Sequence, residues 1–275
     1  MGSFFQDRSV MIATMHGKEE VLSEILASVG MEIVTSENLN TDQFGTFSGE
    51  IPRHDDSIVT LRKKCLLANQ VTGIDLVVAS EGSFGQHPFI PFISADEEFL
   101  MLKDFKTNFE IVVKELSTDT NFESRTISDS NELRLFAEKI GFPDHGLILK
   151  SENRIEKGLR DNTHLEQIFN EMLIKDRHGV VVETDMRAMN NPTRMKVIGL
   201  AALKLKNAIL SCCPKCRRPD FTVKDFVPGL PCEGCHMPTE SVLLEILKCN
   251  HCGITEERMS KKKFEDPMFC NYCNP

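Results

Sequence analysis

The sequence predicts an α/β protein in which a mixed sheet with helices on both faces is followed by a small cysteine-rich module. Two observations carry this prediction. Short apolar runs alternate with segments whose apolar residues recur every three or four positions, which is typical of strands alternating with amphipathic helices. Nine of the ten cysteines lie after residue 208, and only Cys65 precedes it. We therefore expect an α/β domain at 1–208 and a separate module at 209–275.

The predicted elements of the first domain follow from this periodicity. They begin with strand 9–14, helix 18–29, strand 31–34, helix 57–72 and strand 74–80. They continue with strands 89–93, 98–103 and 109–116, helix 131–140, strand 146–149, helix 164–174, strand 180–183 and helix 193–210. Cys65 shares the apolar face of its helix with Leu61 and Ala68, so we expect it to pack in the core.

Charge and apolar content argue against several classes of protein. The formal net charge is −9, which disfavours strong nonspecific binding of the whole chain to nucleic-acid phosphates. No apolar run approaches the length of a membrane-spanning helix, and the first residues lack the pattern of a signal peptide. We therefore expect a cytoplasmic protein, in which reduced Cys-x-x-Cys pairs bind metal more often than they form disulfides.

Four Cys-x-x-Cys motifs make the second domain a zinc-ribbon-like module. Each motif can present two thiolates to one edge of a tetrahedral zinc ion, so two motifs complete a closed site. We expect two structural zinc ions, held by Cys213, Cys216, Cys232, Cys235, Cys249, Cys252, Cys270 and Cys273. Because sulfur fills all four positions of each ion, the metal would support folding and leave no place for a catalytic water.

The spacing leaves the pairing of the four motifs open. We favour pairing the first with the second and the third with the fourth, because the gaps within these pairs suit zinc ribbons. A cross-braced pairing, first with third and second with fourth, fits the same spacing. His236 and His251 lie beside the motifs and are alternative ligands, whereas Cys212 is expected to be a spare thiol.

Three polar loops fall at predicted strand ends, where open α/β folds bind their ligands. In the first loop, a strand runs into Gly17 and a helix begins near Lys18. Such a turn presents backbone N–H groups and an ammonium to an anion such as phosphate, and Thr14 adds a hydroxyl. The alternative is an ordinary strand-to-helix turn, because the single glycine does not make a Walker loop.

The second loop carries acids. Glu81 ends a strongly apolar strand, and Glu50 stands just before a helix. Two carboxylates that meet near phosphate are the usual way to hold Mg²⁺, or Mn²⁺ in its place. The alternative for each residue is an exposed acid in a turn.

The third loop joins the last predicted strand to the last helix and is dense in charge. Arg187, Arg194 and Lys196 suit phosphate binding, because arginine offers the bidentate geometry that phosphate favours. Glu183 and Asp185 could instead pair with the arginines as part of the structure.

Six segments and the four cysteine motifs resemble an uncharacterised bacterial family that is catalogued as a domain of unknown function. The segments are 12–18, 42–53, 80–85, 141–146, 183–188 and 191–196. The resemblance covers nearly the whole chain. It implies no activity, only that these loops occur together with this zinc module.

Residues 8–85 and 190–205 also resemble nucleotide pyrophosphatases of the inosine-triphosphatase type. The positions that match that family are Thr14, Lys18, Glu50, Glu81, Thr193, Arg194 and Lys196. The sequence departs from the family in lacking an Asn before the lysine and in having Ser80 beside the second acid. The resemblance implies a nucleotide-hydrolysing fold in which Glu50, Glu81 and Lys18 are catalytic.

Our leading hypothesis joins these loops into one site. The first domain would bind a nucleotide or another small phosphorylated ligand, with phosphate neutralised by Lys18, Arg187 and Arg194. Mg²⁺ or Mn²⁺ held by Glu50 and Glu81 would activate a water that attacks a phosphoanhydride.

A second hypothesis places the function in the zinc module. It would be a non-catalytic adaptor that binds RNA or protein, using Arg217, Arg218 and the lysines at 261–263. A third role for the module, equally compatible with the sequence, is to cap the last helix or to form a homodimer.

Overall fold

The computed structural model describes residues 4–36, 39–44, 55–176 and 179–275. The chain forms two compact units, one of residues 5–206 and one of residues 207–275 together with Phe4. Within the first unit, strands and helices build two sheets with their own cores. The predicted mixed α/β class is confirmed.

The first sheet has five strands in the order β2-β1-β3-β4-β5. Their bounds are β1 (Ser9–Ala13), β2 (Glu32–Val34), β3 (Leu76–Gln86), β4 (Ser94–Asp104) and β5 (Phe109–Ser117). β2, β1 and β3 are parallel, whereas β4 and β5 add antiparallel strands to the edge. Because β1 lies between β2 and β3, the connection from β1 leads to the strand on one side of it. The next connection, from β2, leads to the strand on its other side. The carboxyl ends of β1 and β3 therefore form a topological switch point, the usual place for a ligand crevice in such sheets.

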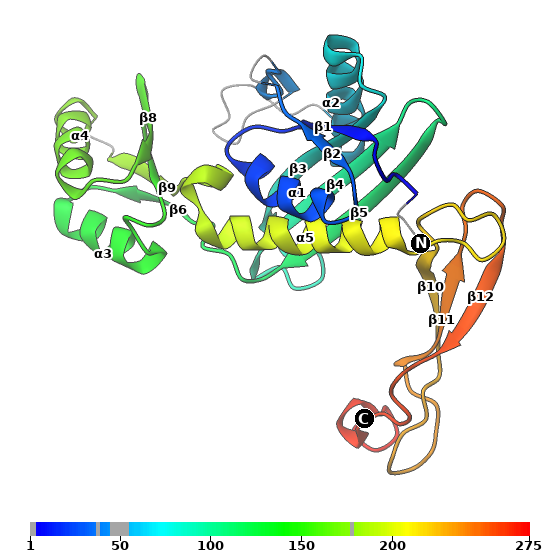
Figure 1. Cartoon of the computed structure of the whole chain (residues 1–275). Helices are drawn as coiled ribbons and strands as arrows, with labels where there is room; N and C mark the ends of the chain where they lie inside the picture. Colours follow the sequence, from blue (N-terminus) through cyan, green and yellow to red (C-terminus); the bar gives the residue numbers. More distant parts are fainter. Residues whose placement is uncertain (1–3, 37–38, 45–54, 177–178) are drawn as a thin grey trace. The chain divides into compact units, whose positions relative to one another are not determined.

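Helices cover both faces of this sheet (Figure 1). α1 (Lys18–Ala27) and α5 (Pro192–Leu210) lie on one face, and α2 (Ser57–Thr72) lies on the other. α2 begins at the N-cap Asp56, whose side chain accepts the Val59 N–H, and ends at Gly73 in the left-handed conformation. Cys65 is fully buried between α2 and the sheet, as predicted, and burial raises the pKa of its thiol to about 12.

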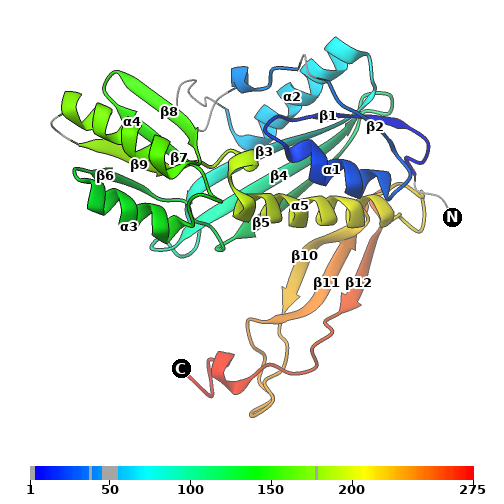
Figure 2. The ribbon, with the colours of Figure 1, turned by 60° about the vertical axis from the view of Figure 1, so that its left-hand side comes forward.

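The second sheet of this unit is antiparallel, in the order β6-β9-β7-β8, and α3 and α4 pack against it (Figure 2). Its elements are β6 (Ser124–Ile127), α3 (Ser130–Ile140), β7 (Leu147–Ser151), β8 (Arg154–Leu159), α4 (Asn162–Lys175) and β9 (Val180–Thr184). The sequence predicted one mixed sheet and missed β6 and β8. Both strands have largely exposed or half-buried side chains, so they lack the apolar alternation that identifies a strand.

The predicted strand at 89–93 is wrong. β3 runs on to Gln86, and residues 87–93 form the turn into β4. Pro88 and Pro91 lack the N–H that a sheet ladder requires, which explains why this apolar run is a turn. Phe89 and Phe92 remain more than four-fifths exposed there.

The second unit is a three-stranded antiparallel sheet, β10-β11-β12. Its strands are β10 (Thr222–Pro228), β11 (Val242–Lys248) and β12 (Thr255–Met259). Single turns of 3₁₀ helix elsewhere in the chain are η1 (Asp42–Phe44), η2 (Ala188–Asn190) and η3 (Pro267–Phe269).

Candidate metal centres and ligand-binding loops

The eight predicted zinc ligands gather into two groups of four. One group is Cys213, Cys216, Cys249 and Cys252, and the other is Cys232, Cys235, Cys270 and Cys273. Within each group the four sulfur atoms lie within 4.8 Å of one another. Among the described residues, these are the groups in which three or more Cys, His, Asp or Glu side chains could share a metal ion.

The sulfur spacing fits zinc. Four ligands at about 2.3 Å around a tetrahedral zinc ion lie about 3.8 Å apart. The Sγ–Sγ distance is 3.6 Å for Cys213–Cys252 and for Cys216–Cys249. In the second group, it is 3.8 Å for Cys232–Cys273 and 3.6 Å for Cys235–Cys270. These distances exceed that of a disulfide bond, and all ten cysteines are free thiols.

In the first and fourth motifs, backbone N–H groups of the turn point at the sulfur of the first cysteine. Burial opposes ionisation of Cys213, but N–H groups of Cys216 and Lys215 point at its sulfur and lower its pKa to about 6. N–H groups of Tyr272 and Cys273 likewise outweigh burial and lower the pKa of Cys270 to about 7. Without a metal ion the second cysteine of each of these motifs keeps its proton, because neighbouring cysteine sulfurs raise the pKa of Cys216 and of Cys273 to about 12. Thiolates are the form that binds zinc, so Cys213 and Cys270 are the ligands that the backbone favours.

The pairing of the motifs is cross-braced, and the preferred ribbon-like pairing is wrong. β10 separates the first motif from the second, β11 separates the second from the third, and β12 separates the third from the fourth. Each strand carries the chain from one end of the sheet to the other. The first and third motifs therefore meet at one end, and the second and fourth meet at the other (Figure 1).

The two metal sites differ in burial. In the first, Cys213 and Cys249 are buried and the other two ligands are half-buried, packed with Phe221, Leu247 and Ile254. In the second, Cys235 and Cys273 are exposed. Large apolar side chains near its ligands in sequence are also exposed, namely Met237, Phe264, Met268, Phe269 and Tyr272.

At the switch point of the first sheet, two of the predicted phosphate-binding residues meet. The Nζ atom of Lys18 donates to Oγ of Ser80 at 3.0 Å, and the hydroxyls of Ser80 and Thr14 are 2.9 Å apart. Lys18 and Ser80 are buried. Gly17, at φ 79°, forms the N-cap of α1 without a side-chain acceptor, so the first N–H groups of the helix have no side-chain cap.

Lys18 lies in an environment that disfavours its charge. The pKa of Lys18 is lowered to about 7. Burial is the largest cause, and the positive charge of Arg194 is the second largest. An anion beside its ammonium would offset both effects.

Of the two predicted acids, Glu81 lies among the described residues. Glu81 is buried and forms an ion pair with Lys64 of α2, at 2.5 Å between Oε2 and Nζ. Because side chains alternate along a strand, Glu81 points to the α2 face, and Ser80 points to the opposite face with Lys18. Glu50 lies outside the described residues.

Arg194 belongs to a buried ion pair, which the sequence did not predict. Its Nε donates to Oε1 of Glu98 on β4 at 2.6 Å, and both side chains are fully buried. The guanidinium also donates to the carbonyl of Met186 and lies over the Phe84 ring, 4.9 Å from its centroid. Asn191 holds this geometry by capping α5, because its Oδ1 accepts the Arg194 N–H at 3.0 Å.

The other basic residues of the third loop have separate surroundings. Arg187 pairs with the buried Asp185 at 2.6 Å, which is the structural alternative considered for this loop. Lys196 is exposed and lines a surface groove of about 590 Å³. Gly17 lines the same groove, so the first and third loops meet there, together with Val21, Met189 and Met195.

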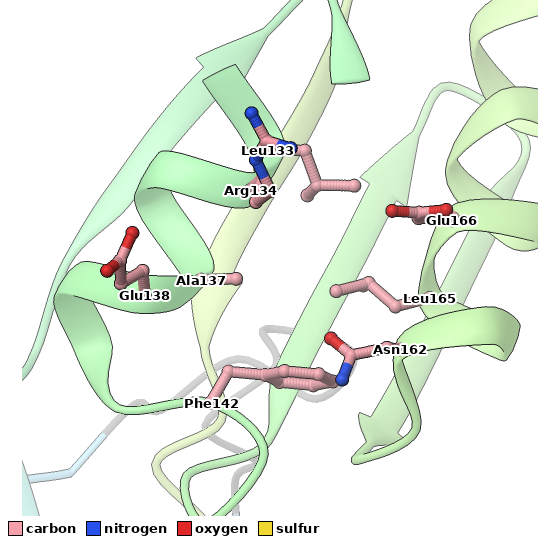
Figure 3. Close-up of a pocket in the computed structure, with 8 residues that line it drawn as sticks. All are labelled: Leu133, Arg134, Ala137, Glu138, Phe142, Asn162, Leu165 and Glu166. Carbon is pink, nitrogen blue, oxygen red and sulfur yellow. The ribbon is translucent and has the colours of Figure 1, made fainter. Parts of the chain in front are cut away.

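A second pocket, of about 290 Å³, lies between α3 and α4 and is lined by none of the predicted site residues (Figure 3). Leu133, Ala137, Phe142 and Leu165 give it an apolar wall, and Arg134, Glu138 and Glu166 add charges.

The sequence missed Ser80, Asp96 and Glu98 as members of the buried polar cluster around Lys18 and Arg194. Asp96 and Glu98 flank Glu97, and a run of three acids is typical of an exposed segment. Only α5 packing on this face shows that they are buried.

Fold and sites together define an α/β protein that carries a cross-braced pair of four-cysteine metal sites. The family model described as "Domain of unknown function (DUF6671)" matches residues 64–275, and the chain belongs to that family. The match includes Glu81, Arg194 and all eight cysteines of the candidate metal sites, whereas Thr14, Lys18 and Glu50 precede it.

Other comparisons add little. No curated protein matches the chain. Among solved structures, the hypothetical protein CT253 from Chlamydia trachomatis is similar at 12% identity, covering 74% of this chain and 98% of that protein. Its TM-score of 0.26 supports no conclusion about the fold. Within the described residues, no helix is both long enough and apolar enough to span a bilayer.

Proposed function

We propose that the chain binds a nucleoside phosphate, or a related phosphorylated metabolite, at the switch point between β1 and β3. The observation that carries the proposal is the chain of contacts from Lys18 Nζ through Ser80 Oγ to Thr14 Oγ1. These three groups stand where the topology of an open α/β sheet locates its ligand. The uncapped N-terminus of α1 adds N–H groups that favour an anion.

The adjoining groove suits the rest of such a ligand. Its volume of about 590 Å³ is in the range of small-molecule sites, and its wall combines methionines with Lys196 and Arg160. A phosphate near Gly17 would leave a base or another flat group against Met189 and Met195.

Hydrolysis of a phosphoanhydride is the enzymatic form of the proposal. A divalent cation would supply an activated water, whose oxygen would bond to phosphorus as the bridging P–O bond breaks and phosphate or pyrophosphate leaves. Lys18 would neutralise the charge that develops. Glu81 does not serve this step, because it is paired with Lys64 on the opposite face of the sheet.

Binding is tested by calorimetry with nucleoside mono-, di- and triphosphates, with and without Mg²⁺. We expect Lys18→Met to reduce affinity at least tenfold and Lys139→Met, an exposed lysine on α3, to leave it unchanged. Equal affinity in the wild type and in Lys18→Met would refute the site. Release of phosphate or pyrophosphate, measured on the same samples, decides whether binding leads to hydrolysis.

Affinity should also depend on pH. The pKa of Lys18 lies near 7, below its usual value, so the ammonium is lost as pH rises through 7. Binding that uses this charge weakens by about tenfold for each further pH unit. The expected readout is a fall in affinity between pH 7 and 9 in the wild type that is absent in Lys18→Met.

A second candidate, an adaptor that binds RNA or protein, is favoured by the aromatic side chains near the second metal site. Phe269 and Tyr272 are 64% and 63% exposed, and exposed rings are stacking platforms for single-stranded RNA and anchors for protein partners. A gel shift of labelled RNA, compared between the wild type and Phe269→Ala/Tyr272→Ala, tests the RNA form. Unchanged RNA binding in the double variant would exclude these rings from it.

A further inference from the structure

Three carboxylate oxygens of β4 are buried without a hydrogen-bond donor in the described structure. They are both oxygens of Asp96 and Oε2 of Glu98. Each side chain is 0% exposed. A buried carboxylate without a donor is costly, so native proteins supply a water, a proton or an ion to such a group.

These oxygens lie on the same face of the sheet as Ser80. Glu98 is directly opposite Gly82, and Asp96 is opposite Phe84, in the antiparallel ladder of β3 and β4. Opposite residues share a face, and so do positions two apart on one strand. The acids of β4 therefore face the side of the sheet that carries Lys18, whereas Glu81 faces α2.

The charges around Asp96 do not satisfy it. Arg194 of α5 donates to Oε1 of Glu98, and Lys18 of α1 donates to Ser80. The pKa of Asp96 is raised to about 8, mainly by burial and secondly by the negative charge of Glu98. The positive charges of Arg194 and Lys18 act in the opposite direction. The site thus has two carboxylates with spare acceptor capacity next to the proposed phosphate position.

We propose that Asp96 and Glu98 bind a divalent cation of the Mg²⁺ class, in place of the predicted pair Glu50 and Glu81. Mg²⁺ takes oxygen ligands and is usually held by one or two carboxylates, with water and substrate phosphate completing its shell. The cation would give all three orphan oxygens a partner. Coordination of the cation by a substrate phosphate rests on the proposed function. Coordination by Asp96 and Glu98 is independent of it.

Titration of the zinc-loaded full chain with Mn²⁺ tests this site, because the room-temperature paramagnetic resonance signal reports free Mn²⁺. Mn²⁺ prefers oxygen ligands and will not displace zinc from thiolates. We expect one Mn²⁺ site in the wild type, weakened at least tenfold in Asp96→Asn and unchanged in the matched control Glu81→Gln. Because Glu98 also holds Arg194, Asp96→Asn carries the test, with circular dichroism and zinc content to verify its fold.

The titration is run without nucleotide and with a non-hydrolysable nucleoside triphosphate. Nucleotide binding with no bound Mn²⁺ in either series would overturn the cation site and leave the proposed function standing. Mn²⁺ binding that Asp96→Asn abolishes, with no nucleotide binding at all, would support the cation site and overturn the proposed function. Loss of Mn²⁺ in Glu81→Gln but not in Asp96→Asn would also overturn the cation site.

Discussion

The two units of the chain are stabilised in opposite ways. Residues 5–206 enclose apolar cores on both of their sheets, and charges are buried within them. In residues 207–275, β12 is wholly exposed and most of β10 is exposed as well. The buried residues that cluster in this unit are Cys213, Phe221 and Cys249, and the two cysteines belong to a candidate metal site. A sheet without a core cannot offset the entropy of folding, so metal must take the place of apolar burial here.

The largest expected effect is that of metal removal. A strong chelator should unfold residues 207–275 and leave residues 5–206 folded, because only the first unit has a core independent of metal. Hydrogen exchange read by mass spectrometry checks this, with the re-addition of zinc as the control. If the amides of β10–β12 stay protected from hydrogen exchange after complete removal of zinc, the second unit does not depend on metal for its folding.

A smaller effect should separate the two metal sites. Cys249→Ser and Cys270→Ser both alter a buried ligand, at 2% and 1% exposure. Cys249→Ser should release zinc and disrupt the apolar cluster of Phe221, Leu247 and Ile254, whereas Cys270→Ser should cost one zinc and leave that cluster intact. Zinc content and exchange of the β11 amides are the measurements. Equal loss of protection of the β11 amides in both variants would mean that the two metal sites stabilise the sheet together and not separately.

The smallest effect is expected in the α/β unit. A Cβ at Gly82 would lie 2.5 Å from the Arg194 guanidinium and 2.7 Å from the Glu98 carboxylate. Gly82→Ala should therefore displace the buried pair and lower the free energy of unfolding by up to roughly 3–5 kcal/mol, the cost of leaving one charge of such a pair uncompensated. Gly85→Ala is the matched control on the same strand, because a Cβ there meets nothing within 4 Å. Urea denaturation of both variants measures the difference, and equal stabilities would show that the pair tolerates displacement.

Much of the fold could be predicted from local patterns. The predicted helix at 57–72 matches α2, and the first strand and helix differ from β1 and α1 only at their ends. β6 and β8 could not be predicted, since their side chains are mostly exposed and their identity comes from pairing with β9 and β7. The apolar run at 89–93 was misassigned because hydrophobicity alone does not distinguish an exposed turn from a buried strand.

The sequence by itself determined the eight cysteines of the candidate metal sites, because the Cys-x-x-Cys turn is local and its chemistry follows from spacing alone. It also located Lys18 at a strand-to-helix turn. Only the tertiary structure decided which motifs share a metal ion, because that depends on the end of the sheet to which each strand carries the chain. Likewise, only packing paired Glu81 with Lys64 and Arg194 with Glu98, and left Asp96 buried without a donor. The partner of a buried charge depends on which helix face packs on which sheet face. The residues on those two faces can be far apart in the sequence.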